Sequence, residues 1–474
     1  MTPRSVHLTA IGGVGMTSLA GLLVALGHRV RGSDVDVYPP ASDRLAALGV
    51  PVCKGYAVRN LAPRPDLVVI GNAIRADNPE AADARRRGIP TLSMPEALES
   101  LILPTRTPLV VAGTHGKTTS SSFLAWVLQT AGREPGWFIG GEPVDLAAGY
   151  RLGGGHEFVL EGDEYDSAYF DKGPKFLHYR AAGLVLTSVE FDHADIYRDL
   201  EHVKSSFVRL IARLPPGAPL VVSAEFPHAL DVARCAGRPL VGFSASTPAD
   251  WSAVDLTDGP GGLRFVARGP GEEFPLVSPL LGRMNVRNLL GVTALSRALD
   301  VPVEAIQRAT ETFHGVRRRQ QVVVDGEIIL IDDFAHHPTA IEGTLRAVRA
   351  RHPDRRVWAL FDPRSNTTRR RVFQERIADA LAEADIAVFG PVHRAEQIDP
   401  GDRFSPQEAC DRIVARGRVA EAVDDHAALA ERVLAGVRSG DVVVVLSNGA
   451  FGGVLGRLRA GLASRPPVAR ADRR

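Results

Sequence analysis

"VVAGTHGKTTSS", residues 110–121, is the stretch that decides the fold class of this chain. Phosphate-binding loops of the form G-x-x-x-x-G-K-[ST] follow a strand and open a helix, and this stretch contains the same Gly-Lys-Thr ending. Val111 occupies the place of the first glycine of that form, and only two residues separate Gly113 from Gly116. The stretch is therefore either a shortened phosphate-binding loop or a chance Gly-Lys-Thr at the end of a strand.

The sequence on either side of this loop favours phosphate binding. An apolar run over 109–112 precedes the loop, and a helical pattern over 117–129 follows it. In that arrangement the backbone N–H groups from Gly116 onwards face the β- and γ-phosphates, Lys117 supplies a positive charge, and the Thr118 hydroxyl binds Mg²⁺. The residues that we expect to contact ATP here are Gly113, Thr114, His115, Gly116, Lys117, Thr118 and Thr119.

Length and composition describe a soluble protein with several domains. A chain of 474 residues exceeds what one core supports, and 45% hydrophobic with 23% charged residues is ordinary for globular proteins. The net charge of +1 argues against a nucleic-acid partner. Three scattered cysteines, an N-terminus without a signal pattern and short apolar runs favour a cytoplasmic location. We expect a cytoplasmic monomer that acts on small molecules, with neither a nucleic-acid nor a membrane partner.

Short β-branched runs alternate with helical patterns along almost the whole chain, which predicts α/β layers with mainly parallel sheets. The predicted strands span 6–12, 28–34, 51–55, 66–72, 109–114, 156–163, 183–193, 218–225, 238–245, 327–334, 356–363, 385–392 and 441–448. The predicted helices span 15–26, 79–88, 117–129, 338–350, 369–383 and 425–437. The stretch that follows 245 gives no clear pattern.

These blocks predict three α/β domains. We expect a Rossmann-like domain over 1–105, a central domain resembling P-loop ATPases over 106–316, and a second Rossmann-like domain over 317–462. The two prolines of "ILPTRTP", 102–108, indicate a linker after the first domain. Residues 463–474 are rich in proline and arginine and are expected to form a disordered tail.

The turn "IGGVGMTS", residues 11–18, lies between a predicted strand and a predicted helix. Gly13 and Gly15 let the backbone turn tightly and approach a pyrophosphate at the N-terminus of the helix. Ser18 stands where a dinucleotide fingerprint has its third glycine, so a nicotinamide cofactor and another nucleotide diphosphate are both compatible. A turn without a ligand is the structural alternative, and Asp34, which ends the next strand, could equally be a cap.

Two predicted strands of the central block end in acidic segments. "VLEGDEYD", 159–166, and "SVEFDHAD", 188–195, place carboxylates and one imidazole at these ends. Because the carboxyl ends of parallel strands share one edge of a sheet, we expect these side chains beside the phosphate-binding loop. Of these groups, Glu161 and His193 are our candidate ligands for Mg²⁺, together with Thr118, and the other acids could be solvated loop residues.

Polar residues near the second domain boundary have two interpretations. Asn285 and Asn288 are three apart in a helical pattern, so both can face one side and either contact an adenine or cap the helix. The arginines at 317–319 form either a solvated face or a clamp on a γ-phosphate.

Three strand ends of the third block carry further polar residues. "IDDFAHHPTAI", 331–341, suggests a loop that contacts substrate or ribose, because the sequence offers no third and fourth ligand at zinc-site spacing. Arg364 could form a bidentate pair with a carboxylate, and Asn448 could help to close the backbone around a polar ligand.

Taken in order, these motifs resemble the Mur ligases, the ATP-dependent amide-forming enzymes of peptidoglycan assembly. The short loop of that family, G-[TS]-x-G-K-[ST], matches residues 113–118, which makes the opening stretch a phosphate-binding loop. "IGGVGM" and "DDFAHHPT" look like the branch that acts on UDP-N-acetylmuramate. The segments similar to members that attach a recycled tripeptide are "EGDEYDSAYFDKGPKFLHYR" (161–180), "EFDHADIY" (190–197), "DPRSNT" (362–367) and "LSNGAFGG" (446–453).

The resemblance implies a ligase that joins UDP-N-acetylmuramate to L-alanyl-γ-D-glutamyl-meso-diaminopimelate through an acyl phosphate, with ATP and Mg²⁺. It implies a UDP-sugar-binding first domain, an ATP-binding central domain and a peptide-binding third domain. It also implies catalytic roles for Lys117, Glu161 and His193. Adenine, phosphate or ribose contacts are implied for Asn285, Asn288, Arg319 and Asp333. Substrate contacts are expected from Gly12, Gly13, Gly15, Asp34, Asn72, His336, His337, Arg364, Asn366 and Asn448.

Three other functions remain compatible with the sequence. The nearest is the ligase of the same branch that adds free L-alanine, which differs only in its amine substrate. An NAD-dependent oxidoreductase is supported by the turn at 11–18 and by Asp34 alone. A nucleotide-binding regulator without catalytic activity is the third alternative.

Overall fold

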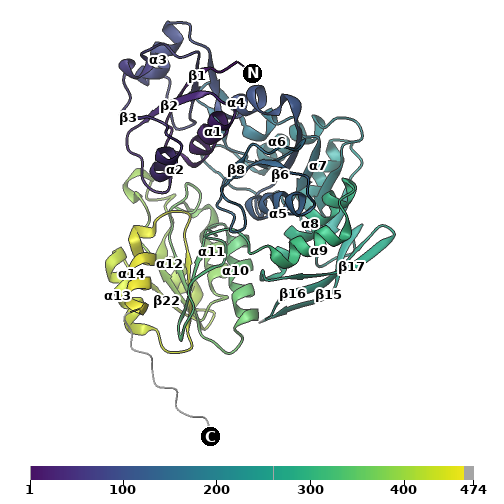
Figure 1. Ribbon diagram of the computed structural model, residues 1–474. Helices are drawn as coiled ribbons and strands as arrows, with labels where there is room; N and C mark the ends of the chain where they lie inside the picture. Colours follow the sequence, from purple (N-terminus) through teal and green to yellow (C-terminus); the bar gives the residue numbers. More distant parts are fainter. Residues whose placement is uncertain (1, 260, 464–474) are drawn as a thin grey trace.

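The computed structural model describes residues 2–259 and 261–463, which build three α/β units around three main sheets (Figure 1). In Figure 1 the N-terminal unit lies at the top, the central unit at the right and the C-terminal unit at the lower left. The predicted α/β class with mainly parallel sheets is confirmed. Among the described helices, none has both the length and the apolar character needed to cross a membrane.

The N-terminal unit is a parallel sheet with the strand order β3-β2-β1-β4-β5. Its strands are β1 (Ser5–Thr9), β2 (Arg29–Asp34), β3 (Val52–Lys54), β4 (Leu67–Ile70) and β5 (Thr91–Ser93). Its helices are α1 (Val14–Ala25), α2 (Ala41–Ala47), α3 (Pro79–Arg86) and α4 (Met94–Leu101). The elements α2, α4 and β5 are not among those predicted from the sequence, because they are too short to show a recognisable hydrophobic period.

The central unit contains a ten-stranded sheet in the order β17-β16-β15-β14-β13-β12-β6-β9-β7-β8. Its strands are β6 (Thr107–Ala112), β7 (Gly136–Phe138), β8 (Tyr150–Arg151), β9 (Glu157–Gly162), β12 (Gly183–Leu186), β13 (Leu220–Ser223), β14 (Val241–Ser244), β15 (Trp251–Gly259), β16 (Gly262–Gly269) and β17 (Glu272–Ser278). Its longer helices are α5 (Lys117–Thr130), α6 (Leu200–Ala212), α7 (Pro227–Cys235), α8 (Arg283–Ala298) and α9 (Val303–Thr312). The strands β10 (Asp166–Ala168) and β11 (Asp171–Pro174) form a separate antiparallel pair.

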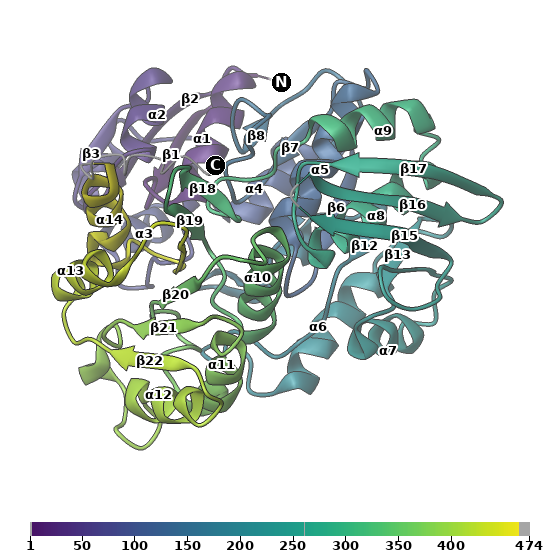
Figure 2. The same ribbon diagram turned by 90° about the horizontal axis from the view of Figure 1, so that it is seen from below.

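The segment without a clear sequence pattern forms the antiparallel strands β15, β16 and β17. Figure 2 shows these strands projecting from the central sheet on the side away from the C-terminal unit. Their outer residues are partly exposed, so the hydrophobic periodicity that marks the buried parallel strands is weaker here.

The C-terminal unit is a six-stranded sheet in the order β18-β19-β23-β20-β21-β22, in which only β18 is antiparallel to its neighbour. Its strands are β18 (Gln321–Val324), β19 (Ile329–Asp333), β20 (Val357–Phe361), β21 (Ile386–Phe389), β22 (Val419–Ala422) and β23 (Val442–Leu446). Its helices are α10 (Pro338–Arg351), α11 (Gln374–Leu381), α12 (Pro406–Val414), α13 (His426–Gly436) and α14 (Val454–Ala463).

Four local predictions need correction. The predicted strand over 183–193 ends at Leu186, because the residues that follow form a loop at the end of β12. Pro108 of the predicted linker lies inside β6, and the predicted helix over 369–383 begins only at Gln374. Ala463 closes α14, and the rest of the predicted tail lies outside the described residues.

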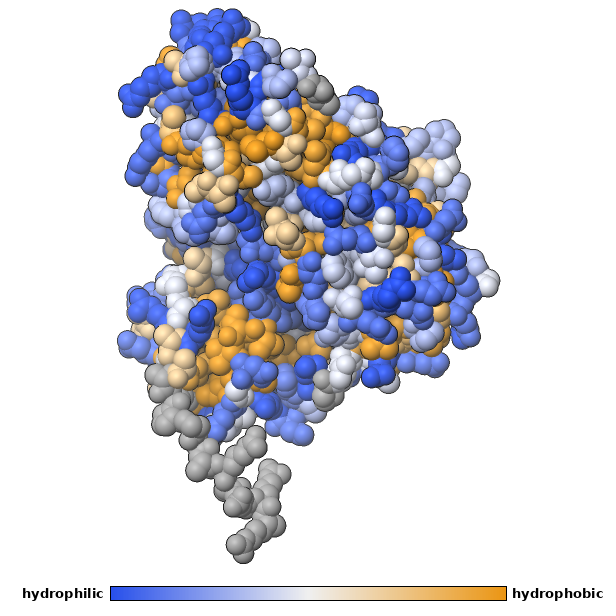
Figure 3. Space-filling view, viewed as in Figure 1, coloured by the Kyte–Doolittle hydropathy of each residue, from blue (hydrophilic) through white to orange (hydrophobic). Residues whose placement is uncertain are grey.

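The strand β6 is buried on both faces, which places the phosphate-binding loop at the centre of the molecule. Leu109 and Val111 face a core that includes α5 and α8, whereas Val110 and Ala112 face a second core. The second core also contains residues of the N-terminal sheet, such as Val6. The N-terminal and central units therefore share one continuous core. On the face seen in Figure 3, two apolar areas, one over the N-terminal unit and one over the C-terminal unit, are separated by mainly hydrophilic surface.

A fully buried carboxylate holds the N-terminal unit together. Glu80 on α3 accepts hydrogen bonds from His7 (3.0 Å), Thr9 (3.0 Å) and Ser33 (2.6 Å), and its other oxygen accepts one from Asn60 (2.7 Å). These donors come from β1, β2 and the segment that follows β3. Burial raises the pKa of Glu80, but the hydrogen bonds from His7, Ser33 and Asn60 outweigh this effect and place the pKa below its ordinary value of 4.5.

We predict that Glu80→Ala lowers the free energy of unfolding by about 3 kcal/mol, because it leaves several buried donors without an acceptor. The contribution of the charged Glu80 is complete above pH 4.5 and is lost as the pH falls through the lower pKa of the folded state. The difference in urea midpoint between the wild type and Glu80→Gln, measured for the first unfolding transition, should therefore shrink below pH 4.5. A difference that stays constant down to pH 3 would contradict this assignment.

Candidate active site

One large cavity of about 1310 Å³ lies between the three units and is lined by residues from each of them. Many of the residues proposed from the sequence line it. They are Gly12, Gly15, Thr114, His115, Gly116, Lys117, Thr118, Thr119, Glu161, His193, Asn285, Asn288, Arg319, Asp333, His336 and His337. The tertiary structure thus brings segments from the first, second and third predicted domains to a single space.

The loop between β6 and α5 has the backbone shape that its two glycines permit. Gly113 and Gly116 have φ values of +132° and +82°, in the region that favours glycine. A Cβ atom on Gly113 would collide with Thr187, and one on Gly116 would collide with the side chain of Asn288. Both positions therefore require glycine for conformation and for space, and Gly116 caps a helix whose first residue is Lys117.

Lys117 is held by the loop and by one carboxylate. Its ammonium group donates to the carbonyl oxygens of Gly113 (2.7 Å) and Thr114 (3.3 Å) and to Glu164 (3.0 Å). Burial lowers the pKa of Lys117, but the negative charges of Glu164, Asp163 and Glu161 outweigh this effect and raise it. The side chain is 12% exposed and stays charged, so it can attract a phosphate group at the cavity.

Glu161 has the surroundings that a Mg²⁺ ligand requires. Its Oε1 accepts a hydrogen bond from the Thr118 hydroxyl (2.6 Å), and its Oε2 accepts one from the backbone N–H of Gly140 (2.7 Å). The pair offers two hard oxygen donors next to Lys117, and such oxygens are the ligands that Mg²⁺ prefers. The residues present therefore fit a magnesium ion bound together with a phosphate.

His193 shares a carboxylate with Lys117. Its Nε2 lies 3.3 Å from Glu164, and its ring contacts the ring of Tyr165 with 4.1 Å between centroids. Burial lowers the pKa of His193, but the hydrogen bond to Glu164 and the charge of Asp192 outweigh this effect and raise it. His193 and Glu161 thus lie on the same side of the cavity as Lys117, as predicted for the ends of β9 and β12.

The two asparagines on α8 face the cavity together. Asn288 donates to the side-chain oxygen of Asn285 (3.1 Å), and Asn285 donates to the carbonyl oxygen of Leu281 (2.8 Å). Among the described residues, no side chain caps α8 at its N-cap residue, Gly282. The cavity interpretation of this pair is thus favoured over the capping interpretation.

Within the described part of the chain, Arg319 is the one arginine of 317–319 that lines the cavity without a close carboxylate partner. Arg319 lies over the ring of Phe334 at 4.9 Å. Arg318 instead donates to Asp332 (3.2 Å) and to the carbonyl oxygen of Ser447 (2.8 Å), which joins two strands of the C-terminal sheet. Arg317 is exposed at the edge of the cavity and lies 3.9 Å from Glu142.

The turn at 11–18 is held by Asp34. The backbone N–H of Gly12 donates to Asp34 (2.8 Å), and the hydroxyl of Tyr56 donates to the other oxygen of that carboxylate (3.2 Å). Gly12 and Gly15 line the cavity, whereas Gly13 precedes α1 as its cap. Asp34 does not line the cavity, so its position indicates support of the turn, and Asn72 is an exposed residue outside it.

Three predicted substrate-binding residues of the C-terminal unit lie outside this cavity. Asn366 donates to Asp195 (2.8 Å), and Arg364 packs against Gly449, where a Cβ atom would collide with its guanidinium group. The side-chain oxygen of Asn448 is buried and has no hydrogen-bond partner among the described residues. A role for these residues in binding a peptide stays a prediction.

Asp333 and His336 form hydrogen bonds mainly with backbone groups close to them. Asp333 accepts hydrogen bonds from the N–H groups of Gln320 (2.8 Å) and Ala335 (2.6 Å). His336 donates to the carbonyl oxygen of Phe334 (3.1 Å). Both residues line the cavity, but the carboxylate of Asp333 already accepts these two hydrogen bonds.

The structure places at the site several charged groups that are not among the candidates from the sequence. Glu164 bridges Lys117 and His193, and the partly exposed Asp163 pairs with Lys175 (2.7 Å). The acidic run at 161–166 signalled that carboxylates gather here. It could not show which of them face the loop, because the chain turns away after Gly162 at the end of β9.

The loop that follows β12 also joins the central unit to the C-terminal unit. The hydroxyl of Thr367 donates to Asp192 (2.9 Å), and the ring of Phe191 packs edge-on against Phe373. Burial and the neighbouring His115 lower the pKa of His337 to about 3, so this imidazole at the junction is neutral. The contacts of Asp192 and Phe191 link residues 175 and 182 positions apart in sequence, and no local pattern signals them.

Comparison with known protein families covers most of the chain. Residues 5–106 match the model described as "Mur ligase family, catalytic domain", residues 111–296 match "Mur ligase middle domain", and residues 317–449 match "Mur ligase, glutamate ligase domain".

Individual proteins are similar over their full lengths. A UDP-N-acetylmuramate–L-alanyl-γ-D-glutamyl-meso-2,6-diaminoheptandioate ligase of Escherichia coli K12 is 36% identical, over 98% of this chain and 99% of that protein. A UDP-N-acetylmuramate–L-alanine ligase of Paraburkholderia phytofirmans is 34% identical, over 96% and 98%. The crystal structure of a murein peptide ligase from Psychrobacter arcticus has a TM-score of 0.73 and 31% identity, over 98% of this chain and all of that one. The chain belongs to the Mur ligase family.

Proposed function

We propose that this protein is an ATP-dependent ligase that joins the lactyl carboxylate of UDP-N-acetylmuramate to the amine of L-alanyl-γ-D-glutamyl-meso-diaminopimelate, with release of ADP and phosphate. Relatives that carry this activity in their names match the chain over nearly its whole length. The cavity supports the proposal most directly, because it unites the phosphate-binding loop, a glycine-rich turn and the edge of the C-terminal sheet.

We further propose a division of labour among the three domains. Residues 1–105 would bind the UDP-sugar, 106–316 ATP and 317–462 the peptide. The family models, which match residues 5–106, 111–296 and 317–449, support this division. Gly12 and Gly15 would approach the pyrophosphate of the UDP-sugar at the N-terminus of α1.

The reaction proceeds in two steps that need no nucleophile from the protein. A carboxylate oxygen of the muramate attacks the γ-phosphorus, the bond to ADP breaks, and an acyl phosphate forms. The peptide amine then attacks the acyl carbon, and the tetrahedral intermediate expels phosphate, which carries away the amine proton. Lys117 and Arg319 would stabilise the charge on the transferred phosphate, so positioning and electrostatics supply the rate enhancement.

We propose that Thr118, Glu161 and His193 hold Mg²⁺ at the phosphates. A magnesium ion there would neutralise phosphate oxygens during transfer. Glu161 contributes a carboxylate that is already oriented by Thr118 and Gly140. His193 can bind a metal only through a ring nitrogen that carries no proton, so a proton on that nitrogen would have to leave when the ion binds.

The amine substrate distinguishes this function from its nearest alternative. Relatives named as L-alanine ligases are 32–34% identical, close to the values of the tripeptide ligases. With UDP-N-acetylmuramate, ATP and Mg²⁺ present, we predict that phosphate release is at least about tenfold faster with the tripeptide than with free L-alanine, a difference of about 1.4 kcal/mol. Faster turnover with L-alanine would reassign the enzyme to the alanine-adding branch and leave its ligase chemistry intact.

We predict that Lys117→Ala reduces kcat/KM for phosphate release at least about 100-fold, because one buried donor to the transferred phosphate is lost. Lys172→Ala is the matched control, since this exposed lysine pairs with Asp166 outside the cavity and should leave the rate unchanged. Circular dichroism checks that both variants fold. Normal turnover by folded Lys117→Ala would refute the assignment of the loop.

A further inference from the structure

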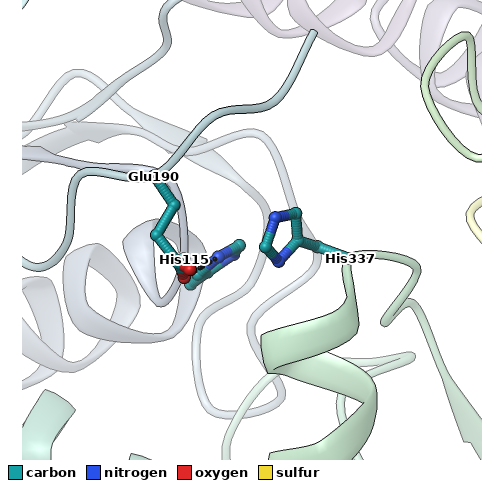
Figure 4. A group of neighbouring side chains, drawn as sticks. All are labelled: His115, Glu190 and His337. Atoms are coloured by element: carbon teal, nitrogen blue, oxygen red, sulfur yellow. Dashed lines mark hydrogen bonds and ion pairs between the residues drawn. The ribbon is translucent and has the colours of Figure 1, made fainter. Parts of the chain in front are cut away.

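Three potential metal ligands from separate segments meet beside the phosphate-binding loop (Figure 4). His115 belongs to that loop, Glu190 follows β12, and His337 precedes α10 of the C-terminal unit. One ligand atom from each lies within 4.8 Å of the others. Within the described ranges this is the one such group of three histidine, cysteine or acidic side chains.

The contacts within the group are close and directed inward. The Nε2 of His115 lies 2.9 Å from Glu190, and the rings of His115 and His337 are 4.3 Å apart between centroids. Figure 4 shows the two rings adjacent to each other, with the carboxylate of Glu190 at the ring of His115. His337 is buried, and the side chains of His115 and Glu190 are 14% and 18% exposed. The group is thus sheltered but reachable from the cavity.

We propose that His115, Glu190 and His337 bind a divalent transition-metal ion of the zinc type, with water as a fourth ligand. Two imidazoles and one carboxylate are a ligand set known for zinc, and imidazole favours such ions over Mg²⁺. None of these three residues belongs to the magnesium site proposed above, where Thr118 and Glu161 offer oxygen donors and His193 one nitrogen. This inference concerns a second metal and does not depend on the ligase activity.

The remaining contacts of Glu190 leave one oxygen available for a metal. Its Oε1 accepts hydrogen bonds from the hydroxyl of Thr339 (3.1 Å) and from Arg376 (3.3 Å), whereas its Oε2 contacts only His115 among the described hydrogen bonds. Outer partners of this kind orient a ligating carboxylate. The nearby charge of Arg376, which is half-exposed, opposes a cation weakly because water screens it.

Closing the site requires a small movement. Ligands at zinc distances of about 2.1 Å stand about 3.4 Å apart in a tetrahedron, so the group must contract by about 1 Å. His337 would give up one of two long contacts, to Phe191 or to Thr339, each 3.3 Å. Because His337 belongs to the C-terminal unit, a bound ion would connect that unit directly to the loop that carries Lys117.

Cobalt(II) tests this proposal, because tetrahedral Co²⁺ with nitrogen ligands absorbs visible light far more strongly than octahedral Co²⁺ with oxygen ligands. The full chain is freed of metals with a chelator and titrated with Co²⁺ in excess Mg²⁺ without nucleotide. We expect one equivalent of strongly absorbing Co²⁺ that Zn²⁺ displaces. His337→Ala and Glu190→Gln should each weaken Co²⁺ binding at least about tenfold, and Glu190→Gln carries the test if His337→Ala does not fold.

Two matched variants separate this site from its neighbours. His336→Ala removes the adjacent histidine, whose ring lies 3.9 Å from Asp192 and outside the group, and Glu161→Gln removes the magnesium carboxylate. Both should keep the Co²⁺ absorption. The proposal is overturned if the wild type shows no strong absorption, if folded His337→Ala or Glu190→Gln keeps it unchanged, or if either matched variant abolishes it.

Discussion

The in-register pairing of three parallel strands is the constraint on which the site depends. In the central sheet Val111 of β6 pairs with Glu161 of β9, and Ala112 pairs with Leu186 of β12. The three strands therefore end at one level, and the segments that follow them must leave the sheet at the same edge. The strand register therefore brings three features to this edge: Lys117, the acidic run after β9 and the loop with His193.

That convergence creates an electrostatic problem, which the protein solves by pairing charges. Carboxylates that are removed from water are costly unless cations or hydrogen-bond donors compensate them. Here Glu164 is balanced by Lys117 and His193, and Asp163 by Lys175. The ammonium group of Lys117 is paired with Glu164, so a phosphate that binds this group, as we propose, would compete with that carboxylate. The carboxylates thus hold the positively charged side chains of the site in position before any ligand binds.

The loop over 187–195 gives the central and C-terminal units a common boundary. It contacts the phosphate-binding loop through Glu190, and it contacts the C-terminal unit through Phe191 and Asp192. The same few residues therefore carry His193 and touch the edge of the neighbouring sheet. A movement of the C-terminal unit would therefore change the surroundings of His193 directly, because the residues next to His193 contact that unit.

The sequence by itself determined the α/β class, the glycine loop before α5 and the acidic ends of β9 and β12. These features are local. A buried parallel strand appears in the sequence as a continuous apolar run, and the positive φ values of this loop at Gly113 and Gly116 favour glycine. Only the tertiary structure decided that Glu164 is the partner of Lys117, that Arg318 rather than Arg319 pairs with Asp332, and that His337 meets His115. These pairings join residues tens to hundreds of positions apart, and strand order and unit packing place them together without leaving a periodic signal in the chain.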